Sequence, residues 1–177
     1  EIGTTTAIPV PKPITKELKN RVISTPERFV VQSQGGSAIC LDMRRRVEVT
    51  NLAMDASKRF ITFDWAGYED EGHVIMDRSG PGQALDTGKR PAMSASRQRL
   101  AAVHQSDSSY ATLNGLGIWQ VGQVGMQTLA VVEVPEMADW RVDGWRGEDC
   151  IDLSAIPFAR MPANTALLPS IARDRFM

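Results

Sequence analysis

The sequence contains little of what most catalytic and metal sites are built from. It has two histidines, His73 and His104, and two cysteines, Cys40 and Cys150, in 177 residues. Histidine is the usual base near neutral pH, and a serine hydrolase of the common type would also need a G-x-S-x-G turn, which is absent. The few histidines and cysteines form no zinc-ligand spacing, and the EF-hand calcium spacing is missing. The sequence therefore predicts no metal, no cofactor and no recognisable catalytic set.

The chain also lacks a long apolar run and an excess of one charge. Its longest uncharged apolar stretch, around residues 129–132, is strand-sized, whereas a membrane-spanning helix needs roughly 20 residues. Lys and Arg total 20 against 21 Asp and Glu, so the formal net charge is −1. A dedicated nucleic-acid-binding protein carries a basic excess, which the short cluster 44–46 does not provide. We therefore expect no membrane span and no nucleic-acid partner.

Short apolar runs separated by glycine and proline fill most of the chain, most clearly from Asp77 to Trp119. This pattern is typical of antiparallel strands joined by tight turns. The expected strands are 29–31, 38–41, 47–49, 60–63, 73–76, 99–104, 116–121, 126–134, 139–145 and 150–153. They predict an all-β, mainly antiparallel fold, which could be a sandwich, an open barrel or propeller-blade-like sheets. No repeat of fixed period is obvious in the sequence.

The ends of the chain differ from its middle. Residues 1–13 are rich in Thr and Pro and are expected to form an extended segment. Residues 14–22 are the best early helix candidate, with Thr15 as its cap and Ile14, Leu18 and Val22 packing inward. A single β-rich domain is expected over 14–158, followed by a tail, 159–177, that packs on the domain or on a neighbour.

The segment 90–101 reads R-P-A-M-S-A-S-R-Q-R-L-A. It resembles the blade motif of TolB-type β-propellers, in which a Pro, a bulky residue and a Ser precede a polar turn and a strand. The usual turn of that family is Pro-Asp-Gly, whereas this chain has Ala95-Ser96-Arg97, and residues 117–121 look like the next strand of the blade. The resemblance implies antiparallel β-structure, export and a role in protein contacts rather than catalysis.

A second segment, Asp107-Ser108-Ser109-Tyr110, directly follows a predicted strand. It resembles the Ser-Gly-x-Tyr contact loop of the small periplasmic lysozyme inhibitors, with Tyr110 as the matching position. The resemblance implies an inhibitor-like protein in which Tyr110 contacts the target. Ser108, in the same loop, is a further candidate contact residue. The contact loop on this interpretation is 106–113.

Two observations bear on the compartment. The chain begins at Glu1 rather than Met, as a mature protein does after removal of a signal peptide, or as a trimmed chain does. Cys40 and Cys150 either pair, as expected in an oxidising compartment, or remain unpaired as small buried hydrophobes. If a signal peptide was removed and the two cysteines pair, the protein is periplasmic or secreted.

Aromatic residues mark the candidate binding sites. Trp65 and Tyr68 lie in the predicted loop 65–71, and Trp140 and Trp145 bracket Arg141. Trp, Tyr and Arg are favoured anchors at protein interfaces, although Trp140 and Trp145 could instead cap the core. We therefore expect an exported, non-catalytic protein that recognises a protein or a glycan through its inter-strand loops and that could oligomerise.

Two alternatives remain open. The first is a carbohydrate-active hydrolase, because Asp64 and Glu69 flank the aromatic residues of the loop and glycosidases use a pair of carboxylates. The second is a structural or assembly subunit that contacts its neighbours through the Pro-rich start or the tail.

Overall fold

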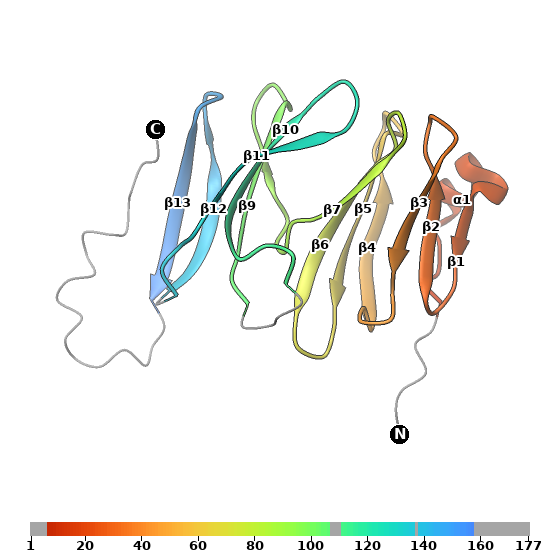
Figure 1. The fold of residues 1–177 in the computed structure, drawn as a ribbon, viewed down its shortest axis with the longest axis horizontal. Helices are drawn as coiled ribbons and strands as arrows, with labels where there is room; N and C mark the ends of the chain where they lie inside the picture. Colours follow the sequence, from red (N-terminus) through yellow and green to blue (C-terminus); the bar gives the residue numbers. More distant parts are fainter. Residues whose placement is uncertain (1–6, 107–110, 137, 158–177) are drawn as a thin grey trace. The chain divides into compact units, whose positions relative to one another are not determined.

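Antiparallel β-sheets make up most of the protein (Figure 1). The structure is a computed structural model and describes residues 7–106, 111–136 and 138–157. Within these residues it contains strands, one short α-helix and one 3₁₀ turn, which confirms the all-β prediction. The chain divides into two compact units, where the sequence predicts one domain over 14–158. Unit 1 comprises the described residues up to Asp86 with Gln123–Met126, and unit 2 comprises Thr87–Gly122 and the described residues from Gln127 onward.

Unit 1 combines a helix with two sheets. Helix α1 (Lys12–Leu18) and the 3₁₀ turn η1 (Lys19–Arg21) precede a sheet of β1 (Val22–Ser24), β2 (Arg28–Gln32) and β3 (Ala38–Asp42). The second sheet consists of β4 (Glu48–Met54), β5 (Phe60–Ala66), β6 (Glu71–Asp77) and β7 (Gln83–Asp86), paired in chain order. Apolar side chains from the helix, both sheets and the residue that follows β3 form one core: Ile14, Leu18, Phe29, Val31, Ile39, Met43, Ile61, Phe63, Val74 and Met76.

The helix differs from the one predicted over 14–22. It begins earlier and ends at Leu18, and Val22 belongs to β1. Ile14 and Leu18 are buried, as expected, because they lie four residues apart on one face. Thr15 does not cap the helix; its hydroxyl donates to the carbonyl of Lys12, 3.1 Å away. No side chain caps the helix start. A proline lies in the first turn instead, where a backbone N–H would have no partner within the helix, so the N–H that proline lacks is not needed.

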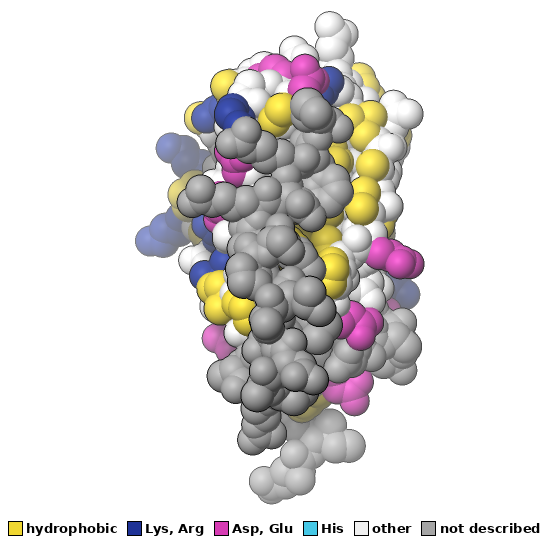
Figure 2. Space-filling view, turned by 90° about the vertical axis from the view of Figure 1, so that its left-hand side faces the viewer, with side chains coloured by type: hydrophobic (Ala, Val, Ile, Leu, Met, Phe, Trp, Pro, Cys, Tyr) yellow, Lys and Arg dark blue, Asp and Glu magenta, His cyan; other side chains and the backbone are white. Residues whose placement is uncertain are grey.

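Unit 2 contains a four-stranded sheet and a hairpin (Figure 1). The sheet pairs β8 (Ala92–Met93), β9 (Arg99–His104), β10 (Gly115–Val121) and β11 (Met126–Val132) in chain order, and the hairpin joins β12 (Ala138–Arg146) to β13 (Cys150–Pro157). The core between them consists of Ala101, Val103, Leu116, Ala138, Trp140, Ile151 and Leu153. Seen from the side of β13, Lys and Arg side chains gather along the left-hand margin (Figure 2).

Each strand predicted from the sequence overlaps a strand of the structure, although residues 47, 133 and 134 of the predicted strands lie outside them. The sequence analysis missed β1, β7 and β8. The first begins at Val22, the last residue of the predicted helix, and has three residues, and β7 and β8 have four and two, which is too short for a clear alternation. In each sheet, strands that are consecutive in the sequence are neighbours, and the sheet is open, with two edge strands. The tail beyond residue 158 lies outside the described residues.

One tight turn occurs twice, which the sequence analysis did not recognise as a repeat. It joins β4 to β5 as M-D-A-S-K and β8 to β9 as M-S-A-S-R. In the first copy the Lys58 N–H donates to the Asp55 carbonyl at 2.9 Å, and in the second the Arg97 N–H donates to the Ser94 carbonyl at 2.9 Å. Both four-stranded sheets therefore begin with the same local structure.

Both cysteines are free thiols, so the disulfide considered from the sequence is not formed. Cys40 is exposed on β3, and Cys150 is partly buried at the start of β13. In the part of the chain that the structure describes, no helix has the length and apolar character needed to cross a membrane.

Candidate functional site

The turn between β5 and β6 presents the most exposed large hydrophobic side chain of the described residues. Tyr68 is 78% exposed. The Gly67 N–H donates to the Asp70 carbonyl at 2.7 Å, so Tyr68 and Glu69 occupy the two central positions of a closed four-residue turn. Tyrosine usually buries much of its ring in a folded protein. Its display on a closed turn is the first sign of a contact site.

The connection between β3 and β4 lies directly against this turn. The Val47 N–H donates to the Ala66 carbonyl at 2.9 Å, and a Cβ added to Gly67 would come within 2.6 Å of the Arg45 carbonyl oxygen. Only glycine therefore fits at position 67. Val47 is 45% exposed. We call the exposed side chains of these two loops the loop surface: Arg44, Arg45, Val47, Tyr68 and Glu69.

A polar cluster under the loop surface holds the two loops together. Asp86 accepts hydrogen bonds from the Arg46 guanidinium at 3.0 Å and from the Trp65 indole N–H at 2.9 Å. The guanidinium also lies 4.8 Å from the centre of the Trp65 ring. Arg46 and Asp86 are only 14% and 9% exposed, so water screens their ion pair weakly. Trp65, predicted as a contact residue, therefore positions the loops from below.

Trp65 depends on a glycine across the sheet. A Cβ added to Gly72 would lie 2.2 Å from the indole nitrogen and 2.7 Å from Asp86 Oδ1. Gly72 is the residue directly opposite Trp65 in the β5–β6 register. The absence of a side chain at position 72 therefore gives the indole its place in the cluster.

The two carboxylates of the hydrolase alternative lie on different elements. Asp64 is on β5, where its Oδ1 contacts His73 Nδ1 at 2.5 Å and its Oδ2 accepts from the Asn51 amide at 2.6 Å. His73 is buried and faces Asp64 directly across the strands. Glu69 is exposed in the turn. Protein groups thus occupy both oxygens of Asp64, an arrangement that orders the sheet.

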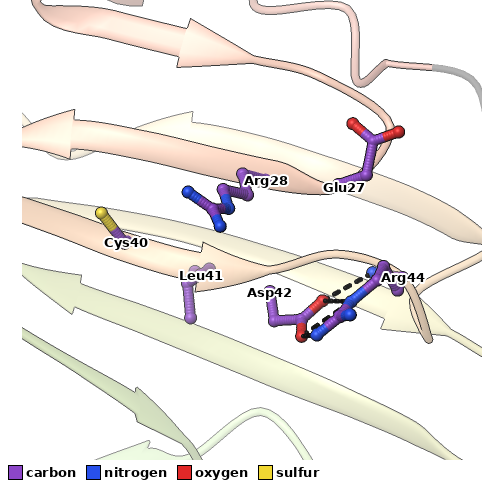
Figure 3. A pocket seen from close by; sticks show the side chains of 6 residues that line it. All are labelled: Glu27, Arg28, Cys40, Leu41, Asp42 and Arg44. Atoms are coloured by element: carbon purple, nitrogen blue, oxygen red, sulfur yellow. Dashed lines mark hydrogen bonds and ion pairs between the residues drawn. The ribbon is translucent and has the colours of Figure 1, made fainter.

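A shallow pocket of about 430 Å³ lies on β2 and β3, next to the loop surface. Figure 3 shows Arg44 folded onto Asp42, with Glu27 pointing away from this pair. Arg44 Nε lies 3.0 and 3.1 Å from the two Asp42 oxygens, and this hydrogen bonding holds the pKa of Asp42 well below its usual value. The other lining residues are Arg28, Cys40 and Leu41. Because Arg44 belongs to both, the pocket extends the loop surface.

The remaining predicted contact residues lie in unit 2 or outside the described residues. Trp140 is 6% exposed, and its indole N–H donates to the Pro135 carbonyl at 2.8 Å. The partly buried Trp145 donates to the Ala92 carbonyl at 3.0 Å and packs against the core of unit 2. Arg141, between them, is exposed. Both indoles thus support the core. Ser108 and Tyr110 lie outside the described residues.

Three residues of the site, Arg46, Val47 and Asp86, could not be recognised from the sequence. These residues matter because of contacts between separate loops, and no local sequence pattern predicts such contacts. Among the residues that the structure describes, no group of three or more His, Cys, Asp or Glu side chains is placed to hold a metal ion.

The comparisons with known proteins add no relative: no family model, curated protein or solved structure matches the chain.

Proposed function

We propose that the protein is a non-catalytic recognition protein that binds another protein through the loop surface of unit 1. The observation that carries this proposal is the display of Tyr68, 78% exposed, on a turn closed by a 2.7 Å hydrogen bond. Tyrosine and arginine are enriched among the residues that contribute most to protein interfaces. The loop surface supplies one tyrosine, two arginines and the exposed Val47 from two loops whose backbones are in contact.

Rigidity supports the same proposal. A partner that binds a mobile loop must offset the entropy of ordering it, at about 0.5–1.5 kcal/mol for each flexible side chain. Here the turn hydrogen bond and the cluster of Arg46, Trp65 and Asp86 fix the backbone under Tyr68 before any partner arrives. Such preorganisation lowers the entropy that a partner must offset when it binds.

The resemblance to TolB-type blades supports a role in protein contacts. The segment 90–101 that carries it forms β8, the repeated turn and part of β9. We propose that the two four-stranded sheets are copies of one blade-like unit, because each is a chain-order meander that begins with the same turn. A periplasmic or secreted location is the corresponding expectation for the compartment.

A crosslinking experiment tests the proposal. A photoreactive phenylalanine analogue at position 68 should capture a distinct protein from an extract of the source organism, whereas the same group at exposed position 97 should not. The captured partner should then bind the Tyr68→Ala variant about 30-fold more weakly, which corresponds to the roughly 2 kcal/mol of a strong interface anchor. Arg97→Ala is the matched control, because Arg97 is also exposed on a tight turn.

Equal binding of the partner to Tyr68→Ala and the parent protein would exclude the loop surface. A partner that turns out to be a second copy of the chain would favour the assembly-subunit alternative, and sedimentation at several concentrations would reveal it.

A further inference from the structure

Unit 2 contains a pocket with a different composition from that of the loop surface. Its volume is about 360 Å³, within the range of small-molecule sites. Lys89 and Arg90 line it from the segment before β8, Ala102 and Val103 from β9, and Arg141 and Val142 from β12. Three of these residues are cationic, three are apolar, and none is acidic. We propose that this pocket binds a small organic anion, a carboxylate or phosphate ester attached to a short apolar group.

One carboxylate, that of Asp139, holds two of the three cationic side chains at the pocket. Asp139 Oδ1 accepts from the Lys89 ammonium at 2.7 Å, and Oδ2 accepts from Arg141 Nε at 3.2 Å and Nη2 at 3.1 Å. The Lys89 hydrogen bond, with that of Arg141, lowers the pKa of Asp139, which is therefore ionised at neutral pH. Asp139 therefore competes with an incoming anion for the N–H groups of Lys89 and Arg141.

Both cations keep the capacity to bind a second anion. An ammonium group has three N–H donors and a guanidinium has five, and the contacts with Asp139 use one and two of them. The side chains of Lys89 and Arg141 are 39% and 59% exposed, so a ligand can reach them from solvent. Guanidinium groups pair with carboxylates and phosphates through parallel hydrogen bonds.

The apolar lining residues favour a ligand that carries an apolar group beside its anionic group. Ala102 and Val103 are 1% and 2% exposed, and Val142 is partly buried. An apolar group of a ligand that lies against this wall is itself removed from water, and the apolar area it loses to solvent favours binding. It also excludes water from the neighbouring charges, and their attraction for the anion then increases. The pocket should therefore prefer phenyl phosphate to inorganic phosphate, and benzoate to benzyl alcohol.

The test is a titration of the whole chain with phenyl phosphate, followed by ¹H–¹⁵N NMR shifts. The amides of the lining residues should shift and saturate, and inorganic phosphate should bind more weakly. Arg141→Gln should weaken binding about tenfold, as expected for the loss of a charged hydrogen bond. The control is Arg146→Gln: this exposed arginine of the same strand pairs with Asp152 at 2.6 Å and does not line the pocket.

Asp139→Asn gives a test of opposite sign. Removing the competing carboxylate should strengthen phenyl phosphate binding, whereas a purely structural role of Asp139 would make the variant bind no better. The proposal is overturned if no saturable shift occurs, if Arg141→Gln and Arg146→Gln bind alike, or if benzyl alcohol binds as tightly as benzoate. A folded Asp139→Asn variant with weaker binding would also overturn it. None of these variants touches the loop surface, so the two proposals fail independently.

Discussion

Lys58 and Arg97 hold the same backbone conformation at the same position of two copies of one turn. Each has φ of 61°, in the left-handed region that favours glycine. The copies also share their side-chain contacts: Asp55 Oδ1 accepts from the Phe60 N–H at 2.7 Å, and Ser94 Oγ accepts from the Arg99 N–H at 3.2 Å. This correspondence is the strongest sign that the two four-stranded sheets repeat one unit.

Replacing Arg97 by glycine should stabilise the protein. A residue with a Cβ costs about 1–2 kcal/mol in the left-handed conformation, and glycine removes this cost. Part of the gain is cancelled because glycine makes the unfolded chain more flexible. We expect a net increase of about 0.5–1 kcal/mol in the free energy of unfolding, measured by urea denaturation. Arg97→Ala keeps the Cβ and should give no increase. If the alanine variant is stabilised as much as the glycine variant, strain at this position is not the cause.

Replacing Arg59 by methionine should destabilise unit 1 strongly. Arg59 Nε and Nη2 donate to the two oxygens of Asp77 at 2.9 and 2.7 Å, and the Asp77 side chain is fully buried. Loss of the guanidinium leaves an uncompensated buried carboxylate, which typically costs about 3–5 kcal/mol. Chemical denaturation measures this loss.

The matched control is Arg44→Met, because Arg44 also pairs with an aspartate. Its side chain is 73% exposed and that of Asp42 55%, so solvent and salt screen the pair. The free energy of unfolding of this variant, measured by the same chemical denaturation, should equal that of the parent. A similar loss in both variants would show that burial does not govern the strength of these pairs.

Asp77 should contribute to the loss of stability in acid. Burial raises its pKa, but the hydrogen bonds from Arg59 and Ser79 outweigh this effect, and the pKa in the folded protein lies below the usual value of 3.8. A lowered folded pKa means that the contribution is present above about pH 4 and is lost as the pH falls through the folded value. The free energy of unfolding, measured by urea titration between pH 2 and 7, should therefore fall less steeply at low pH in Asp77→Asn than in the parent protein. A fall as steep as that of the parent protein would contradict this assignment.

The two free thiols should differ in reactivity. Cys40 is exposed and Cys150 is partly buried, so a thiol reagent should modify Cys40 first in the native protein. Cys40→Ser should remove the fast phase and Cys150→Ser should leave it intact. In denaturant, two thiols per chain should react without a reductant. A mass two units lower than that of the reduced chain would instead reveal the disulfide.

The sequence by itself determined the class of the fold. Alternating runs such as Arg28–Gln32, with buried Phe29 and Val31 between more exposed neighbours, need only local geometry to be recognised as half-buried strands. The same reasoning identified the inward residues Ile14 and Leu18 of the helix. It missed where the helix ends, because Val22 pairs with Val31 of β2, and that pairing overrides the helical spacing.

Only the tertiary structure decided which of the candidate residues share a surface. Trp65 and Tyr68 stand three positions apart in one predicted loop, yet the register of β5 with β6 places the first on a strand, against Asp86, and leaves the second exposed on the turn. Lys89 and Arg141 meet at Asp139 from segments far apart in the chain. A period of two residues assigns a side chain to one face of a sheet, but which loops and which charges become neighbours depends on strand register and on packing between sheets.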